Sequence, residues 1–200
     1  SIAMQAQGYQ FTVVKENPIT SIKNQANSGT CWSFSVVGFL ESELIRTGKG
    51  EHDLSEMYIV RRNYADKADK YVRVGGNLNY AQGGSFADVV ETLDEYGVIP
   101  DADYAGLNYG ETTHRHSELE AGLSGYVKAI SEKKNRKISP VWKAGLNGIL
   151  DAFFGVVPPT FTHQGKSYTH HYHATSQGLE NKKYISLTSL TPQTIYAPFA

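Results

Sequence analysis

The sequence of 200 residues carries a net charge of −1, with 40% hydrophobic and 20% charged residues. This length is enough to bury a sizeable core, and the near-zero charge gives no electrostatic reason to expect a nucleic-acid or membrane partner. No run of about 18 apolar residues is present, so no membrane-spanning helix is predicted, and the single cysteine excludes an internal disulfide.

The chain begins with a segment, residues 1–20, that we expect to be extended. Its first seven residues, Ser1–Gln7, are small and largely apolar, which is typical of the end of a secretory signal; vector-derived residues are the alternative. This pattern favours an exported, periplasmic protein, with the cytoplasm as the other location. Tyr9–Val14 alternates and is rich in β-forming residues, so it is predicted to form a short strand.

Cys31 is the only cysteine, and the residues around it predict a helix that begins there. Ser28-Gly29-Thr30 is a start signal, Gly48 ends the pattern, and apolar residues recur at three- and four-residue steps: Trp32, Phe34, Val36, Val37, Phe39, Leu40, Leu44 and Ile45. Backbone N–H groups at a helix N-terminus favour an anion, so they would stabilise a Cys31 thiolate. A buried structural thiol is the alternative, because free cysteines are often buried.

Gln25 lies six residues before Cys31. Its side-chain NH₂ group and the backbone N–H of Cys31 could together form the pair of donors that holds an oxyanion during acyl transfer. A nucleophilic thiol beside such a donor pair indicates an acyl-transfer site.

Two more helices are predicted after the Cys31 helix. His52–Glu56 opens the first, which runs to about Tyr71, and its basic residues are expected to face solvent: Arg61, Arg62, Lys67 and Lys70. A glycine-dense loop, Gly75–Gly84, leads to the second, in which Ser85-x-x-Asp88 forms a capping box and Gly97 ends the helix. The loop lacks the glycine spacing of the known phosphate-binding motifs.

The rest of the sequence is predicted to be mainly helical, with a small amount of β structure. The predicted elements are a loop at Asp101–Arg115, a helix at Ser117–Lys133, a helix from Ser139-Pro140 to Gly155, a hairpin at Phe161–Tyr168 and a β-rich run at Tyr184–Ser189. Pro140 is expected to occupy the first helical position of its helix.

The pattern Gln25-x5-Cys31-Trp32-Ser33-Phe34-Ser35 resembles the nucleophile segment of papain-like cysteine peptidases. A second match, Gly83-Gly84-Ser85-Phe86-x-Asp88 followed by Glu95-Tyr96-Gly97-Val98-Ile99-Pro100, resembles the Gly-Gly loop of that family and the helix after it. The wider match resembles the bleomycin hydrolase and aminopeptidase C branch. Ser28 stands where papain and cathepsins have a cysteine, so their disulfide at this position is excluded.

This resemblance implies an α+β, papain-like cysteine proteinase fold. Residues 21–200 would form mostly the helical, nucleophile-bearing domain, with a helical insertion at about residues 108–155, and the β-barrel domain would be largely missing from the chain. The implied partners are a peptide substrate, the remaining C-terminal part of the same protein and a second copy of the chain in a homo-oligomer, without nucleic acid or membrane.

The resemblance also implies the activity and the residues that carry it. The reaction would be thiol-dependent peptide hydrolysis of the aminopeptidase type, through a Cys31 acyl-enzyme with Gln25 in the oxyanion hole. The implied substrate-binding residues are Gly83, Gly84 and Trp32. Neither a cofactor nor a metal is expected.

A thiol peptidase also needs a histidine base and a group that orients it. The candidates by distance along the chain are His163, His170, His171 and His173, followed by Asn181. The residues after His173 are polar, and no Asn-Ser-Trp occurs, so we expect the catalytic histidine and asparagine to lie in the missing β domain. Two alternatives stay open: His173 is the base, or the chain is an inactive papain-like module that binds peptides or a partner.

A histidine-based metal site is a further alternative. His170 and His173 could share a helix face, with His163 or His171 as a third ligand. No acidic residue stands beside them as in His-Glu-x-x-His. A hydrated, tyrosine-flanked cluster of histidines on a loop is the preferred interpretation.

Overall fold

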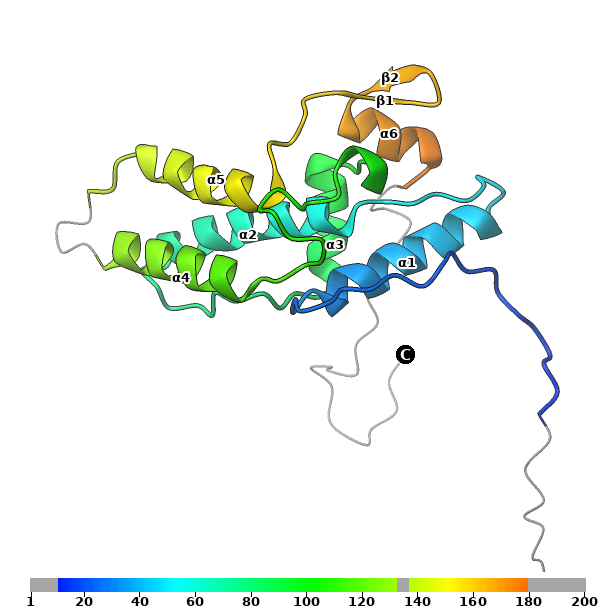
Figure 1. Ribbon diagram of the computed structural model, residues 1–200, viewed down its shortest axis with the longest axis horizontal. Coiled ribbons are helices and arrows are strands. Elements are labelled where there is room, and N and C mark those ends of the chain that lie inside the picture. Colours follow the sequence, from blue (N-terminus) through cyan, green and yellow to red (C-terminus); the bar gives the residue numbers. More distant parts are fainter. Residues whose placement is uncertain (1–10, 133–136, 180–200) are drawn as a thin grey trace, which may run out of the picture.

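The computed structural model describes residues 11–132 and 137–179, in which helices predominate (Figure 1). The elements are α1 (Cys31–Arg46), α2 (Glu56–Arg73), α3 (Phe86–Tyr96), a 3₁₀ turn (Asp101–Asp103), α4 (Ser117–Ser131), α5 (Val141–Phe154), β1 (Phe161–His163), β2 (Lys166–Tyr168) and α6 (His170–Gln177). In this part of the chain, the only sheet is the antiparallel pair of β1 and β2. The fold is therefore α+β with a small β component, as predicted.

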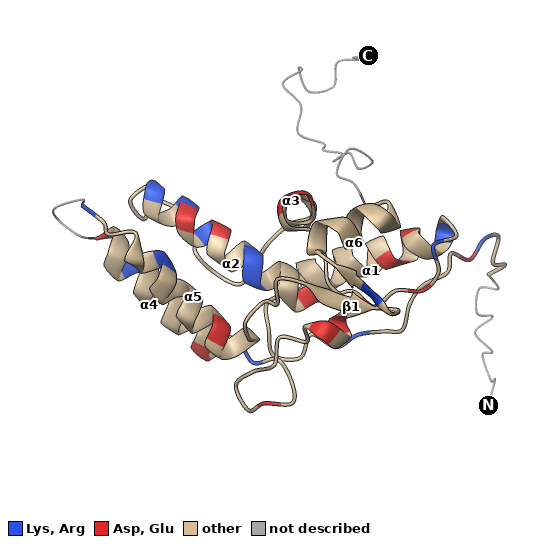
Figure 2. Cartoon of the chain, turned by 90° about the horizontal axis from the view of Figure 1, so that it is seen from above, with Lys and Arg blue, Asp and Glu red and all other residues tan. Residues whose placement is uncertain are grey.

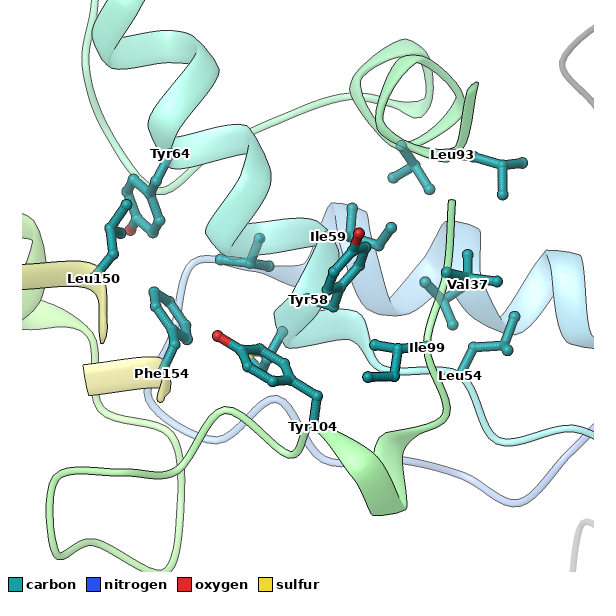
Figure 3. Close-up of a cluster of buried hydrophobic side chains, with 14 of the residues drawn as sticks. Val37, Leu54, Tyr58, Ile59, Tyr64, Leu93, Ile99, Tyr104, Leu150 and Phe154 are labelled. Atoms are coloured by element: carbon teal, nitrogen blue, oxygen red, sulfur yellow. The ribbon is translucent and has the colours of Figure 1, made fainter. Parts of the chain in front are cut away.

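Helix α2 is the centre of the molecule and packs against α1, α3, α4 and α5 (Figure 1). Its tyrosines Tyr58 and Tyr64 are almost completely buried, and each meets aromatic residues from later in the chain (Figure 3). The Tyr58 ring lies edge-on to that of Tyr104 at 6.1 Å, and the Tyr64 ring lies 6.3 Å from that of Phe154. Buried aromatics of this size contribute strongly to core stability.

Both helices predicted here, α2 and α3, are present, and capping contacts mark where they start. The Ser55 hydroxyl accepts a hydrogen bond from the Tyr58 N–H, which places the start of α2 slightly after the predicted one. Both halves of the capping box at Ser85 and Asp88 are formed. Gly97 ends α3 with φ = +78°, and a Cβ there would lie 2.3 Å from the His170 backbone, so only glycine fits.

The strand predicted at Tyr9–Val14 is wrong where it can be compared, because residues 11–14 have no strand structure. In the described part of the chain the strands β1 and β2 pair with each other, which leaves this segment no sheet to join. Val13 and Val14 are instead largely exposed. Residues 1–7 and the β-rich run at Tyr184–Ser189 lie outside the described residues.

The prediction that four basic side chains of α2 face solvent is correct for Lys70 and wrong for Arg61. Arg61 is buried because α5 packs on α2 and brings the Asp151 carboxylate within hydrogen-bond distance of its guanidinium. Arg62 and Lys67 are half-buried. Figure 2 shows that positive and negative residues are interspersed along α2 rather than segregated.

The C-terminal elements follow the prediction with two changes. The hairpin at Phe161–Tyr168 is confirmed, with Thr162 opposite Ser167 in its register. Pro140 lies at the N-cap rather than in the first turn, so α5 begins at Val141. The histidines predicted to lie on a hydrated loop instead begin α6, because Thr169 caps a helix there. Within this helix His173 is fully buried.

None of the described helices combines the length and hydrophobicity that a membrane span requires.

Candidate active site

Cys31 is the first residue of α1, and it is exposed. The helix buries most of the predicted apolar side, although Phe39 is exposed, and its N-terminal tip stays at the surface. The buried residues include Trp32, Val36, Val37, Leu40 and Leu44. The first N–H groups of a helix have no partner within the helix, and the N-cap residue Thr30 makes no side-chain bond to them. The Ser33 and Phe34 N–H groups donate to the Thr30 carbonyl, which leaves the N–H groups of Cys31 and Trp32 available to an anion beside the Cys31 sulfur. The alternative of a buried structural thiol is not supported by this geometry.

The loop before Cys31 is held by its own polar groups. The buried Ser28 hydroxyl donates to the Gln25 carbonyl at 2.7 Å and lies 2.5 Å from the Thr30 hydroxyl. The Asn24 side chain accepts from the N–H of Ala26, which adopts an uncommon φ of +49°. At the position where the resembled peptidases have a half-cystine, Ser28 thus ties the loop by hydrogen bonds.

Gln25 is half-buried, and its side chain points along this loop. Its Nε2 donates to the Ser28 carbonyl at 2.6 Å. A carboxamide nitrogen has two N–H donors, so the other remains to serve a bound group. The amide is thus anchored within the loop that ends at Cys31.

The glycine loop before α3 lies on the other side of the site from the loop before Cys31. The Trp32 indole N–H donates to the Gln82 carbonyl at 2.9 Å, and a Cβ on Gly84 would lie 2.5 Å from the Trp32 ring. The Lys67 ammonium donates to the Gly83 carbonyl at 2.6 Å. Gly83 and Gly84 are exposed, whereas Trp32 is buried beneath them, so the loop presents its backbone to solvent next to Cys31.

Gln82 joins the nucleophile loop to the glycine loop, a role that was not predicted from the sequence. Its Oε1 accepts from the Gly29 N–H at 2.6 Å, and its Nε2 donates to Glu120 of α4 at 2.6 Å. One side chain therefore connects the nucleophile loop, the glycine loop and α4.

A second unpredicted contact comes from the segment before α4. The Asn27 N–H donates to the His114 carbonyl at 2.9 Å, and the His116 N–H donates to the Asn27 carbonyl at 3.2 Å. The His116 ring is fully buried, and this burial, aided by the neighbouring His114, lowers its pKa to about 4. The segment acts as a short parallel partner for the nucleophile loop.

A partly buried group of charges supports the chain just before this loop. The Lys23 ammonium lies 2.7 Å from Glu41, 2.6 Å from Asp53 and 3.1 Å from Glu56. Burial acts to lower the pKa of Lys23, but hydrogen bonds with Asp53 and Glu41 outweigh it, and the net shift is upward. Burial raises the pKa of Glu56 to about 7, with Lys23 acting in the opposite direction. The group ties residue 23 to both α1 and α2.

The C-terminal histidines do not join this site. α1 has 16 residues and is about 24 Å long, and Cys31 lies at its start. The end of α6, at Gln177–Leu179, lines a pocket with Leu44 and Arg46 at the other end of α1. His173 packs against His52, which also follows the C-terminal end of α1. The structure therefore gives no support to His173 as the base for Cys31.

Comparison with known proteins points to the same chemistry. The family model for papain family cysteine proteases matches residues 9–182. The chain is 30% identical to cysteine proteinase 2 of Entamoeba histolytica over 117 residues, which is 57% of this chain and 34% of the relative. It is 29% identical to human cathepsin O over 108 residues, which is 53% of this chain and 30% of the relative.

A solved structure has the same fold at low sequence identity. PepW from Lactobacillus rhamnosis matches with a TM-score of 0.60 at 15% identity, over 86% of this chain and 47% of PepW. The chain spans about a third of the length of these curated relatives.

Proposed function

The chain belongs to the papain family of cysteine proteases, and we propose that it is the nucleophile-bearing part of a thiol peptidase with Cys31 as the nucleophile. The observation that carries this proposal is the exposed Cys31 sulfur at the N-terminal tip of α1, next to helix N–H groups without intrahelical partners. An inert structural cysteine would not need this position.

In the proposed reaction, the Cys31 thiolate attacks the carbonyl carbon of a peptide bond. The carbonyl electron pair moves to oxygen, and the resulting oxyanion accepts hydrogen bonds from the Cys31 N–H and the free N–H of Gln25. The C–N bond then breaks, the amine leaves with a proton from a histidine, and water releases the acyl group from sulfur. The histidine is supplied by a part of the protein beyond the described helical elements.

The glycine loop is the proposed binding surface for the substrate backbone. Gly83 and Gly84 are exposed and have no Cβ, so an extended peptide can approach their backbone closely. Trp32 forms the floor of this surface, and Lys67 fixes the Gly83 carbonyl from behind. The substrate chain would then be held beside Cys31 with its carbonyl directed at the helix tip.

The remaining C-terminal part of the protein would cover a second surface. Residues 17–23 and α1 form a groove of about 520 Å³, whose lining includes Ile19, Ile22, Phe34 and Phe39. Ile19 and Ile22 are largely exposed. The relatives are about three times longer than the matched segment, which supports a further domain that packs here. The helical insertion at about residues 108–155 stays part of this proposal.

The aminopeptidase type and the bleomycin hydrolase branch rest on the sequence resemblance alone. They are supported by Ser28 in place of cysteine and by the pattern from Gly83 to Pro100. An inactive peptide-binding module is the second candidate. The described segments include all seven histidines, and among these residues no histidine forms a hydrogen bond with Cys31.

Alkylation of Cys31 separates these two functions. In the protein that contains its C-terminal part, and with it the proposed histidine, a peptidase site predicts rapid, stoichiometric labelling by an E-64-type epoxide at about pH 6, where an ordinary thiol is protonated and slow to react. Urea-unfolded protein is the control for intrinsic thiol reactivity, and Cys31→Ala is the control for site selectivity. Equal labelling rates in the folded and unfolded chains would contradict the peptidase proposal.

A further inference from the structure

Three histidine side chains converge between elements that are far apart in the sequence. His52 lies in the connection between α1 and α2, His163 ends β1, and His173 lies in α6. Each offers a ring nitrogen, and these atoms all lie within 4.8 Å of one another. Figure 1 shows the hairpin and α6 together, on the same side of the molecule as the segment that leads into α2.

The three imidazole rings are arranged around a common point and are not stacked one on another. The ring centroids are 5.4 Å apart for His163 and His173, and 6.4 Å apart for His52 with either of the others. Imidazole nitrogens that bind one Zn²⁺ at about 2.0–2.1 Å are about 3.3 Å from each other. The three nitrogens therefore need to approach by about 1.5 Å at most, which small side-chain rotations can supply.

The nitrogens of this cluster have lone pairs to offer. His163 Nε2 and both ring nitrogens of His173 are buried and form no hydrogen bond of good geometry with the described residues. The Val98 backbone lies near enough to His173 to favour the protonated ring, but it does not complete such a bond. Buried polar atoms without partners are costly, and an ion is one of the ways they are satisfied.

A backbone carbonyl holds one ring nitrogen of His52. Its Nε2 lies 3.1 Å from the Lys49 carbonyl, and a carbonyl can only accept a hydrogen bond. The proton must then sit on Nε2, which leaves the lone pair on Nδ1. A backbone carbonyl that fixes the tautomer in this way is typical of metal-binding histidines.

The alternative without a metal is that His173 has only a structural role and packs as an aromatic ring. Phe161 and Tyr168 lie edge-on to it at 5.2 Å and 5.3 Å, and burial lowers its pKa to about 4, so the ring is neutral. Packing explains the aromatic neighbours. It does not explain why two further imidazoles, from separate segments, turn their nitrogens toward the same point.

The ligand set differs from the one that the sequence indicated. His170 stacks on Tyr58 at 5.1 Å, and His171 is exposed on α6. Neither belongs to the cluster. The third histidine of the cluster is instead His52, which lies more than one hundred residues earlier in the sequence.

We propose that His52, His163 and His173 bind one divalent transition-metal ion, with Zn²⁺ as the preferred ion. Three neutral imidazoles suit zinc, and its fourth tetrahedral position is left for water. His52 and His163 are partly exposed, so the ion can enter from solvent.

The bound ion would fasten the hairpin and α6 to the connection between α1 and α2. A two-stranded hairpin is only marginally stable by itself, so a metal cross-link would order it. This role is independent of the peptidase chemistry, because the cluster lies near the opposite end of α1 from Cys31.

The test is a Zn²⁺ titration of the full chain carrying Cys31→Ser, so that the thiol cannot contribute a ligand. Calorimetry should give saturable binding of one Zn²⁺ per chain, and Co²⁺ should give the visible absorption of a tetrahedral site. In the same background, His163→Ala and His52→Ala should each weaken Zn²⁺ binding at least about 100-fold, because even loss of an outer-shell partner costs about 10–100-fold.

His171→Ala is the matched control, since this exposed histidine lies on α6 beside the cluster. It should bind Zn²⁺ like the parent, and circular dichroism should show that each variant is folded. Two substitutions on different segments protect the test if one of them fails to fold. The proposal is overturned if the parent shows no saturable binding, if both cluster variants bind as tightly as the parent, or if His171→Ala loses binding equally.

Discussion

The two ends of α1 differ in how their polar groups are satisfied. At the N-terminal end, the loop before Cys31 forms short hydrogen bonds through Gln25, Ser28 and Asn27. At the other end, the buried nitrogens of His163 and His173 have no such partners among the described residues. At the first end these hydrogen bonds are already formed in the absence of a substrate, as the preorganisation of an oxyanion site requires. The second has the features of a site that a ligand completes.

The largest effect on stability is expected from the charges that hold residue 23, just before the nucleophile loop, against α1 and α2. Lys23→Met leaves the fully buried Glu41 without its cation, and removing one partner of a buried ion pair costs about 3–5 kcal/mol. Urea unfolding should show this loss in the free energy of unfolding. Lys70→Met is the matched control, because its pair with Glu91 is exposed and should cost less than about 1 kcal/mol. Equal losses in the two variants would show that the Lys23 group does not support the site.

The next effect concerns Gln25 and appears in rate rather than in stability. Gln25→Ala removes one proposed oxyanion donor, and loss of such a donor lowers the rate by about 10²–10³-fold. The second-order rate of Cys31 acylation by a peptide ester, measured on the protein that contains its C-terminal part, reports this step. Gln177→Ala, on α6, should leave the rate unchanged. If the fall in the acylation rate is matched by a fall in thermal stability, Gln25 has a structural role, through its hydrogen bond to Ser28, instead of a role in the reaction.

The glycine loop offers a pair of adjacent substitutions with opposite expectations. A Cβ at Gly84 would lie 2.5 Å from the Trp32 ring, whereas one at Gly83 meets no atom within 4 Å. Gly84→Ala should therefore destabilise the protein by about 1–3 kcal/mol, as overpacking does. Gly83→Ala should change stability by no more than about 0.5 kcal/mol.

The same pair tests the proposed substrate surface. Because a methyl group at Gly83 would project into open space, Gly83→Ala should raise KM for a peptide substrate without a loss of thermal stability. An unchanged KM in this variant would remove Gly83 from the binding surface.

The parts that could be predicted from sequence depend on neighbours within a few residues. The start of α1 at Cys31 and the capping box at Ser85 were predictable because apolar spacing and cap residues are local signals. The positions of Cys31, Gln25 and Gly84 follow from these elements. The prediction that Arg61 is exposed was wrong because its partner, Asp151, lies ninety residues away in the sequence. No local sequence pattern indicates that contact.

The same limit explains the errors around the histidines. Spacing paired His170 with His173, since both lie on one helix, but the packing of α6 turns His170 toward Tyr58. It then brings His52 and His163 to His173. Contacts of this kind depend on how the helices pack against one another. No periodic pattern in a single sequence predicts that packing.

The remaining expected effect is a pH dependence at the segment that holds the nucleophile loop. The pKa of the buried His116 is about 4 when folded and about 6.5 when unfolded, so the unfolded chain binds more protons between these values. The contribution of His116 to stability is thus present above about pH 6.5 and is lost as the pH falls toward 4.

His116→Phe removes this titration while it keeps a ring beside Phe154. The free energy of unfolding of the parent minus that of the variant should fall by about 1–3 kcal/mol between pH 6.5 and 4. Glu56, whose pKa burial raises to about 7, is present in both proteins, so its opposite pH dependence cancels in the difference. His171→Phe, at an exposed position of α6, is the control for the replacement of a histidine by phenylalanine. A flat difference for His116→Phe would mean that its ring is hydrated in the folded protein, and that the loop carrying Cys31 is less firmly held than its hydrogen bonds indicate.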